Sequence, residues 1–154
     1  MVDLHEIEAI KRLKYTYLRC LDLKQWTEME QCFTADATAA YGDGKYSFAG
    51  RDAIMQFLRA ALGGSHMITS HRVQPEIDLT SASTATGIWA LDDTVIDTNS
   101  NTVIRGAAFY RDEYVKIGGH WKIASTGYQR LFEERLARRD TPSWRLTANR
   151  WAAQ

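Results

Sequence analysis

The stretch "STATGIWALDDTVID", residues 83–97, alternates apolar or aromatic residues with polar ones. Successive residues of a β-strand face opposite sides of a sheet, so this alternation predicts a strand with one buried face. Two stretches of the same kind follow, at 103–117 and 120–132, after short connections at 98–101 and 118–119. Short connections favour antiparallel pairing of neighbouring strands, and antiparallel strands of this length must coil. The second half of the chain therefore predicts a curled antiparallel sheet.

The residues before this sheet predict three helices and further strands. Residues 5–24 place apolar side chains at helical spacing, and residues 51–62 do the same until Gly63 and Gly64 end the pattern. The other expected elements are a short helix at 26–33, two short strands on either side of the turn at 42–44, and strands at 67–74 and 76–80. Together these elements predict an α+β fold, in which a cone-shaped coiled antiparallel sheet carries three N-terminal helices over one concave face.

The composition is that of an ordinary globular protein. The chain has 154 residues, 45% of them apolar, with 19 basic and 19 acidic residues. This length fits one domain, and a net charge of zero gives no electrostatic reason to expect nucleic acid or a membrane as partner. We expect the domain to span 1–134. The arginine-rich residues 135–154 are expected to form a tail, which is a lid, a subunit contact or a partly disordered end.

The sequence contains no motif for a cofactor or a metal ion. Its four histidines and its two cysteines, Cys20 and Cys32, match no metal-binding spacing, and the glycine-rich nucleotide motifs are missing. We therefore expect neither a cofactor nor a metal. The charged N-terminal sequence is unlike a signal peptide, which favours a cytoplasmic location, where both cysteines would be reduced.

Tyr17 and Asp22 lie near the end of the first predicted helix. Tyr17 falls in the middle of its apolar arc, and Asp22 falls at the edge of that arc, between Leu21 and Leu23. Burying an unpaired carboxylate is costly. Asp22 is therefore either paired with a buried partner or partly solvated at a corner between helices.

His71 is the candidate partner. Met67, Thr69, His71 and Val73 share one face of a predicted strand, and the two apolar members indicate that this is the inner face. A histidine in this position is either a hydrogen-bonded core residue or a base. A carboxylate fixes the tautomer of an imidazole and stabilises its protonated form, so an Asp–His pair is a general base near neutral pH.

Asp93 and Arg130 are two further candidates on the sheet. Asp93 is in phase with Trp89 and Leu91, and Arg130 follows Tyr128 by two residues near the end of the last predicted strand. Each of these two charged side chains either points inward with its neighbours or lies on the surface, and the pattern alone leaves both interpretations open.

Several local blocks, from about Ile7 to Glu134, carry a resemblance to a known family. They are "IEAIKRLKYTYLRCLDLKQW", "YGDGKYSF", "PEIDLTSASTATGIWALDD", "GAAFYRDEYVKIGGHWKI" and "TGYQRLFEE". In these blocks the chain resembles the SnoaL-like group of the nuclear transport factor 2-like superfamily and, within it, the bile-acid dehydratases. The resemblance implies a coiled-sheet cone. It also implies an active site at Tyr17, Asp22, His71, Asp93 and Arg130.

The function implied by the resemblance is a cofactor-independent lyase. Foremost is a dehydratase that removes water from a hydrophobic cyclic or steroid-like carbonyl substrate, free or CoA-linked. His71, oriented by Asp22, would remove a proton, while Tyr17 would donate a hydrogen bond to the developing enolate oxygen or the departing hydroxyl. Asp93 would assist the leaving group. Arg130 would hold an anionic part of the substrate or orient Asp22.

Three alternatives remain open at this point. They are an isomerase, a lyase that breaks a carbon–carbon or carbon–halogen bond, and a non-catalytic binder of hydrophobic ligands. In each case a homodimer or homotrimer is expected from the resemblance.

Overall fold

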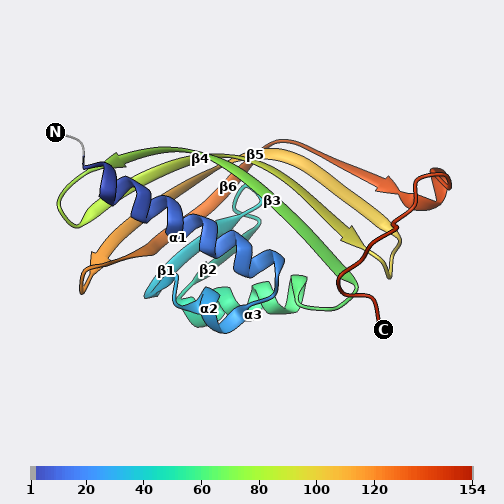
Figure 1. Ribbon diagram of the computed structural model, residues 1–154, viewed down its shortest axis with the longest axis horizontal. Helices are drawn as coiled ribbons and strands as arrows, with labels where there is room; N and C mark the ends of the chain where they lie inside the picture. The colour runs from blue at the N-terminus through green and yellow to red at the C-terminus, as the bar shows by residue number, and fades with distance from the viewer. Residues whose placement is uncertain (1–2, 154) are drawn as a thin grey trace.

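Three helices lie under the concave side of one curled sheet in the computed structural model, which describes residues 3–153 (Figure 1). The six strands are arranged in the order β2-β1-β6-β5-β4-β3, and the sheet does not close into a barrel. The elements, in chain order, are α1 (Leu4–Asp22), α2 (Trp26–Glu30), β1 (Phe33–Tyr41), β2 (Tyr46–Ala49), α3 (Arg51–Leu62), β3 (Met67–Leu79), β4 (Thr84–Asp97), β5 (Thr102–Ile117), β6 (His120–Ala137) and the 3₁₀ helix η1 (Arg138–Asp140). The predicted α+β cone is confirmed.

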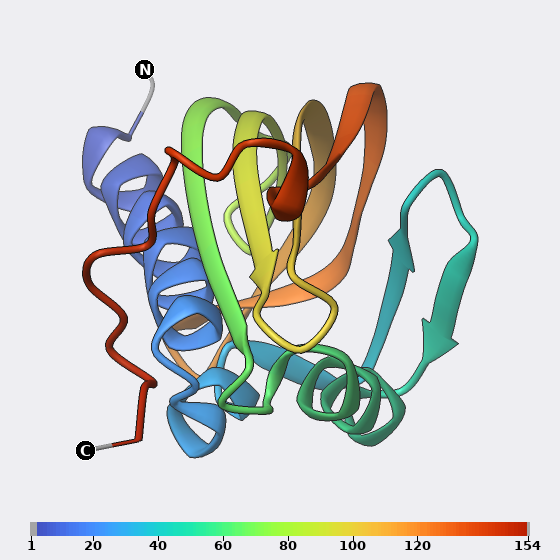
Figure 2. The same ribbon diagram turned by 90° about the vertical axis from the view of Figure 1, so that its right-hand side faces the viewer.

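One pair of strands in this sheet is parallel. β1 pairs with β6 in parallel, whereas every other neighbouring pair is antiparallel, as predicted. The short turns that predicted antiparallel pairing act only between strands that follow one another in the chain, and β1 and β6 do not. The hairpin of β1 and β2 forms one end of the sheet, beside β6, and turns away from the long strands (Figure 2).

The prediction of two strands at 67–74 and 76–80 is wrong, because a single strand, β3, runs through Pro75. Proline has no backbone N–H to give to a neighbouring strand, so it is tolerated where a strand has a neighbour on one side only. β3 is such an edge strand, since it pairs only with β4. At the other end of the sheet, β6 continues to Ala137, beyond the expected domain end at residue 134.

The C-terminal end of α1 is fixed by Lys24. This residue has a φ of 56°, in the left-handed region, so the helix cannot continue through it. Its Nζ donates hydrogen bonds to the carbonyl oxygens of Gly64, at 2.5 Å, and Met67, at 2.7 Å. These bonds tie the end of α1 to the start of β3, which places Asp22, the last residue of the helix, beside that strand.

The core lies between the helices and the inner face of the sheet. Tyr17, Ile54 and Trp89, which come from α1, α3 and β4, are completely buried in it. Within residues 3–153, no helix has both the length and the apolar character needed to cross a membrane.

Candidate active site

Asp22 and His71 form a hydrogen-bonded pair where the end of α1 meets β3. The Asp22 carboxylate accepts three hydrogen bonds, all from β3: from Thr69 Oγ1 at 2.8 Å, from the His71 backbone N–H at 3.0 Å and from His71 Nδ1 at 2.6 Å. Both side chains are largely buried, with 18% of Asp22 and 8% of His71 exposed. The contact expected between them from the sequence is present in the structure.

The contact with Asp22 also fixes the tautomer of His71. An ionised carboxylate can only accept hydrogen bonds, so Nδ1 must carry the proton that is shared with Asp22. In the neutral ring Nε2 is then the unprotonated nitrogen, free to accept a proton. The pair therefore holds a proton acceptor at a defined place on the inner wall of the cone.

His71 faces a cavity of about 480 Å³ inside the cone. Helices α1 and α3 form one wall and the inner face of the sheet forms the other. Most of the lining is apolar or aromatic, including Leu21, Phe57, Leu58, Leu62, Met67, Leu91 and Val95. This volume and this lining are typical of sites for small organic ligands. Asp22 lies behind His71 and does not line the cavity.

Asp93 is the residue of β4 directly opposite His71 in the β3–β4 register. Residues opposite one another in antiparallel strands present their side chains on the same face, about 5 Å apart at Cβ. Both residues line the cavity, so it has a base and a carboxylate next to each other.

Both terminal guanidinium nitrogens of Arg130 donate hydrogen bonds to the Asp93 carboxylate, and Nη2 lies 3.0 Å from Asp93 Oδ2. Nη2 also lies 3.4 Å from the carboxylate of Glu133. Arg130 is thus matched to Asp93, and the sequence-based alternative in which it orients Asp22 is wrong. Its Nε is buried and has no hydrogen-bond partner among residues 3–153. This nitrogen has almost no accessible surface, although other parts of the Arg130 side chain line the cavity.

Tyr17 enters the cavity from α1 as part of a group of phenols. Its hydroxyl lies 2.9 Å from that of Tyr41, and Tyr110 and Tyr128 line the same cavity. Burial raises the pKa of Tyr17 and of Tyr41 well above the ordinary value, so both phenols stay protonated and able to donate. Sequence reasoning identified Tyr17 but missed Tyr41. The signal that could have found Tyr41 is its phase in the strand, because it falls on the same face as Ala37 and Ala39, which are buried.

The structure thus gathers the five predicted residues at one place. Tyr17, His71, Asp93 and Arg130 line the cavity, and Asp22 supports His71 from behind. Thr69, which bonds Asp22, was missed as a site residue although it shares the predicted inner face with His71. The other three histidines, at positions 5, 66 and 120, lie outside the cavity lining. Among residues 3–153, no group of three or more His, Cys, Asp or Glu side chains is arranged to hold a metal ion.

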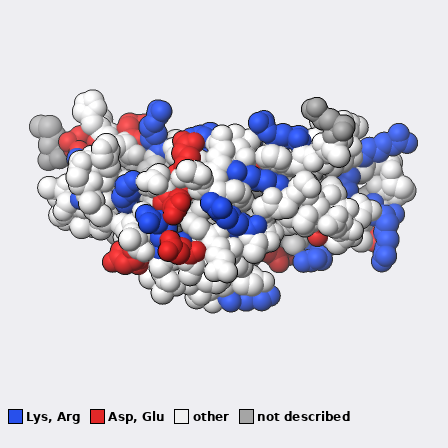
Figure 3. Space-filling view, turned by 90° about the horizontal axis from the view of Figure 1, so that it is seen from below, with Lys and Arg blue, Asp and Glu red and all other residues white. Residues whose placement is uncertain are grey.

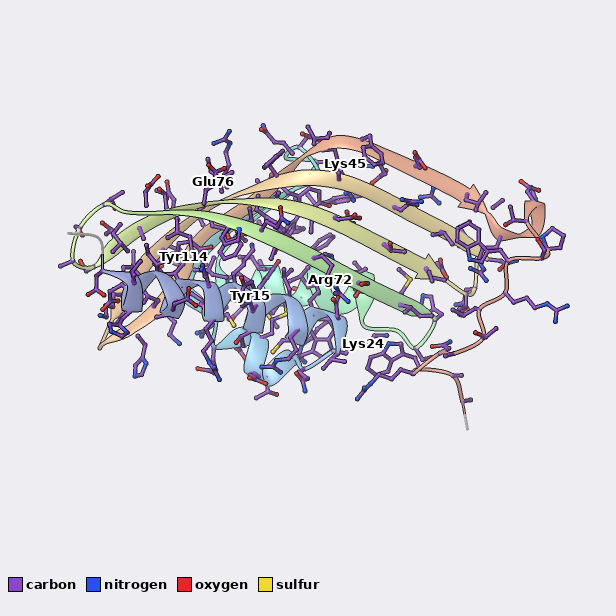
Figure 4. The ribbon with its side chains drawn as sticks, turned by 45° about the horizontal axis from the view of Figure 1, so that its top comes forward. Tyr15, Lys24, Lys45, Arg72, Glu76 and Tyr114 are labelled. Carbon is purple, nitrogen blue, oxygen red and sulfur yellow. The ribbon has the colours of Figure 1, made fainter. Side chains whose placement is uncertain are left out.

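The tail after β6 does not lie among the residues that line the cavity. It turns back at η1 and returns to the C-terminal end of α1 (Figure 1). There the Nζ of Lys24, a residue labelled in Figure 4, lies 4.3 Å from the centre of the Trp151 ring. Arg150 and Trp151 line a groove of about 510 Å³ between α1 and β3, on the outer side of the Asp22–His71 pair. The described part of the tail therefore reaches the outer side of the pair, and its role as a lid or a subunit contact stays a prediction.

The end of the molecule that carries this tail shows mainly basic side chains, whereas acidic and basic residues are mixed over the helices (Figure 3). Arg138, Arg139, Arg145 and Arg150 all belong to the tail.

Comparison with solved structures finds the same fold in proteins of low sequence identity. A candidate scytalone dehydratase from Novosphingobium aromaticivorans has a TM-score of 0.78 at 23% identity, over 95% of this chain and 92% of that one. A hexachlorocyclohexane dehydrochlorinase (LinA type 3) from Novosphingobium barchaimii has a TM-score of 0.75 at 20% identity, over 87% and 92%. ActVI-ORFA from Streptomyces coelicolor has a TM-score of 0.69 at 11% identity, over 82% and 98%.

The coiled sheet, the three helices and these likenesses define the class as the nuclear transport factor 2-like α+β cone. The family model of the SnoaL-like domain matches residues 2–127 of the sequence, which is most of the chain. The protein belongs to the SnoaL-like family.

Proposed function

We propose that the protein is a cofactor-independent lyase, foremost a dehydratase, in which His71 is the general base. The observation that carries this proposal is the contact between His71 Nδ1 and Asp22 Oδ1 at 2.6 Å, with His71 lining an apolar cavity. Imidazole is the side chain best suited to take up a proton near neutral pH. The two structural relatives named above for a dehydratase and a dehydrochlorinase share the fold. Their names support an elimination reaction but not a particular leaving group.

The base begins the reaction by taking a proton from carbon. Nε2 of His71 removes a proton next to a conjugated carbonyl, and the positive charge that the ring acquires is stabilised by Asp22. The electrons move onto the carbonyl oxygen as an enolate, which then collapses to expel hydroxide as water. The proton for the departing hydroxyl comes from a donor in the cavity.

Two donors are available for the oxygens of the substrate. The Tyr17–Tyr41 hydroxyl pair uses only one of its two protons in the bond between the hydroxyls and donates the other in this proposal. Arg130, which also lines the cavity, donates through its guanidinium group. Donors that are already oriented in a site with little water stabilise developing negative charge by several kcal/mol. Asp93, held by Arg130, assists the leaving group in this proposal.

The cavity lining supports the proposed substrate class. A hydrophobic cyclic molecule, such as a hydroxylated steroid with a carbonyl group, would lie against the aromatic and aliphatic walls, with its oxygen atoms toward His71, Asp93 and Arg130. A CoA-linked form of such a substrate would extend through the open mouth, where Lys45 and Arg135 lie. A homodimer or homotrimer remains a prediction, as does a cytoplasmic location.

A substrate screen with two histidine variants tests this proposal. Scytalone, hexachlorocyclohexane and hydroxylated 3-oxo steroids are incubated with the wild type, with His71→Ala and with His66→Ala as the matched control, since His66 lies outside the cavity lining. We expect elimination of water from at least one compound, lost in His71→Ala and kept in His66→Ala. Release of chloride in place of water would move the activity to dehydrohalogenation. Tight binding of a compound without turnover would favour the alternative that the protein is a non-catalytic binder of hydrophobic ligands.

A further inference from the structure

A second polar network lies in the core beneath the cavity, and the reaction above does not use it. Lys14 of α1 and Asp112 of β5 form an ion pair at 2.7 Å, and neither side chain has any exposed surface. Neither residue lines the cavity. Ion pairs in such surroundings are costly to bury and contribute little stability compared with apolar residues of similar size. The fold alone therefore does not explain why the pair is here.

Three donors converge on the Asp112 carboxylate. Oδ2 accepts from Lys14 Nζ and, at 2.7 Å, from the Tyr114 hydroxyl, while Oδ1 accepts from Thr126 Oγ1 at 2.6 Å. Tyr114 in turn accepts from Trp89 Nε1 at 2.8 Å, and it lies between the sheet and α1 (Figure 4). Burial lowers the pKa of Lys14, and the contact with Asp112 opposes that lowering, so Asp112 is the group that supports the ammonium form of Lys14 in the core.

The ammonium of Lys14 faces two of the phenols that line the cavity. Its Nζ lies 3.5 Å from the centre of the Tyr110 ring and 4.8 Å from the centre of the Tyr17 ring. A cation over an aromatic face is attracted by the electrons of the ring and draws them toward itself. Asp112 lies one strand repeat further along β5 than Tyr110, and it is Tyr110, not Asp112, that reaches the cavity. The positive end of the pair is therefore directed at the phenols.

We propose that Lys14 is a positioning residue, whose buried ammonium polarises the Tyr17 and Tyr110 rings and makes the Tyr17–Tyr41 hydroxyl pair a stronger hydrogen-bond donor toward the cavity. The effect is transmitted through a dry core, where a charge acts with much less screening than in water. Its consequence for turnover rests on the proposed function, in which Tyr17 donates to the substrate oxygen. The polarisation itself does not depend on that function.

Ionisation of the phenol at position 17 gives a direct readout. Tyr17 is replaced by 3,5-difluorotyrosine, a more acidic analogue, and its titration is followed by fluorine NMR in the full-length protein. We expect Lys14→Met to raise the pKa of this phenol by about one to two units, because a nearby positive charge is lost. Since Lys14→Met leaves Asp112 unpaired, the double variant Lys14→Met/Asp112→Asn is measured as well. It removes both charges of the pair together, and a smaller rise in pKa is expected.

The matched control is Lys116→Met. This substitution removes another lysine–carboxylate contact between α1 and the sheet, that of Lys116 with Glu6 at 2.6 Å, far from the cavity lining. The control should leave the titration of residue 17 unchanged. An unchanged or lowered pKa in the double variant, which contains no unpaired carboxylate, would overturn the proposal, whether or not a substrate has been found.

Turnover separates this proposal from the proposed function. With a substrate in hand, the double variant should lower kcat about tenfold and leave KM nearly unchanged, because a weakened donor acts mainly on the transition state. A raised pKa of the phenol at position 17, together with no elimination from any compound, would support Lys14 as the polarising group and would overturn the proposal that the protein is a lyase. An unaltered kcat in an active enzyme would show that the polarisation does not reach the reacting atoms, and would overturn its assigned role.

Discussion

Asp22→Asn is the substitution that most sharply tests the base, because it keeps the shape of the side chain and changes the proton on His71. The backbone N–H of His71 is a fixed donor, so the amide oxygen of the new side chain must take the place of Oδ2, which now accepts from it at 3.0 Å. The amide NH2 then replaces Oδ1 and faces His71 Nδ1. An NH2 group can only donate, so Nδ1 must become the acceptor and the ring proton must move to Nε2.

The expected loss of activity has two sources. The charge-assisted bond between Asp22 and the protonated ring contributes about 1.5–3 kcal/mol, or about 10- to 100-fold in rate. Blocking the base with a proton removes most of the general-base contribution, which is about 100- to 10,000-fold. Because the two losses overlap, we expect kcat to fall at least about 100-fold.

Two measurements check this prediction. Nitrogen-15 NMR of the imidazole reports the tautomer without any substrate: Nδ1–H is expected in the wild type and Nε2–H in Asp22→Asn. The loss of water from a substrate found in the screen gives the rate. Thr69→Val is the control, since it removes one hydrogen bond to Asp22 but leaves the carboxylate, and it should keep the wild-type tautomer. A wild-type ring with Nε2 protonated, or more than about a tenth of the activity in Asp22→Asn, would refute the reasoning.

Three further predictions concern stability. Arg130→Met leaves Asp93, whose side chain is only 5% exposed, without its partner, and it should lower the free energy of unfolding in urea by about 3 kcal/mol. The double variant Arg130→Met/Asp93→Leu should recover part of this loss. A loss below about 1 kcal/mol in the single variant would mean that the pair behaves as a solvated ion pair. Burial raises the pKa of the Tyr41 phenol in the folded protein. The stabilisation linked to this raised pKa is complete below about pH 10, where the unfolded chain also keeps the phenol protonated, and it is lost as the pH rises toward the pKa of the folded state. Tyr41→Phe should therefore make the decline of the unfolding free energy at high pH shallower by up to about 1.4 kcal/mol per pH unit, and an unchanged slope would contradict this. Trp151→Ala removes the contact with Lys24 and should lower the unfolding free energy by about 0.5–1 kcal/mol. Trp144, a residue that is 65% exposed, is the control: Trp144→Ala should have a smaller effect, and equal effects would argue against the contact.

Periodicity was enough to predict the long strands and the inward side of most of their residues. The alternation of 83–97 continues without interruption through β4, so Asp93 falls on the same face as Trp89 and Leu91. Periodicity failed at Pro75, because whether a proline interrupts a strand depends on which side of that strand has a neighbour. The sequence around a residue does not contain this information.

The candidate site, too, could be predicted only in part. Asp22 and His71 could be paired in advance because each is unusual in its own pattern: a carboxylate at the edge of an apolar arc and a histidine on an inner strand face. Lys14 and Asp112 escaped notice, since each resembles an ordinary surface charge until both are seen to be buried. Lys14 lies in the middle of the buried face of α1, and its partner is on a strand far along the chain.

The bond from the His71 backbone to Asp22 has a consequence for the behaviour of the protein in concentrated solution. β3 is an edge strand, and an unpaired N–H on such an edge invites the strand of another molecule to add to the sheet. Asp22 occupies this N–H with a negative charge. Asp22→Ala, which leaves this N–H without an acceptor, should therefore aggregate more readily than the wild type, whereas Asp22→Asn, whose amide oxygen still accepts from it, should stay as soluble.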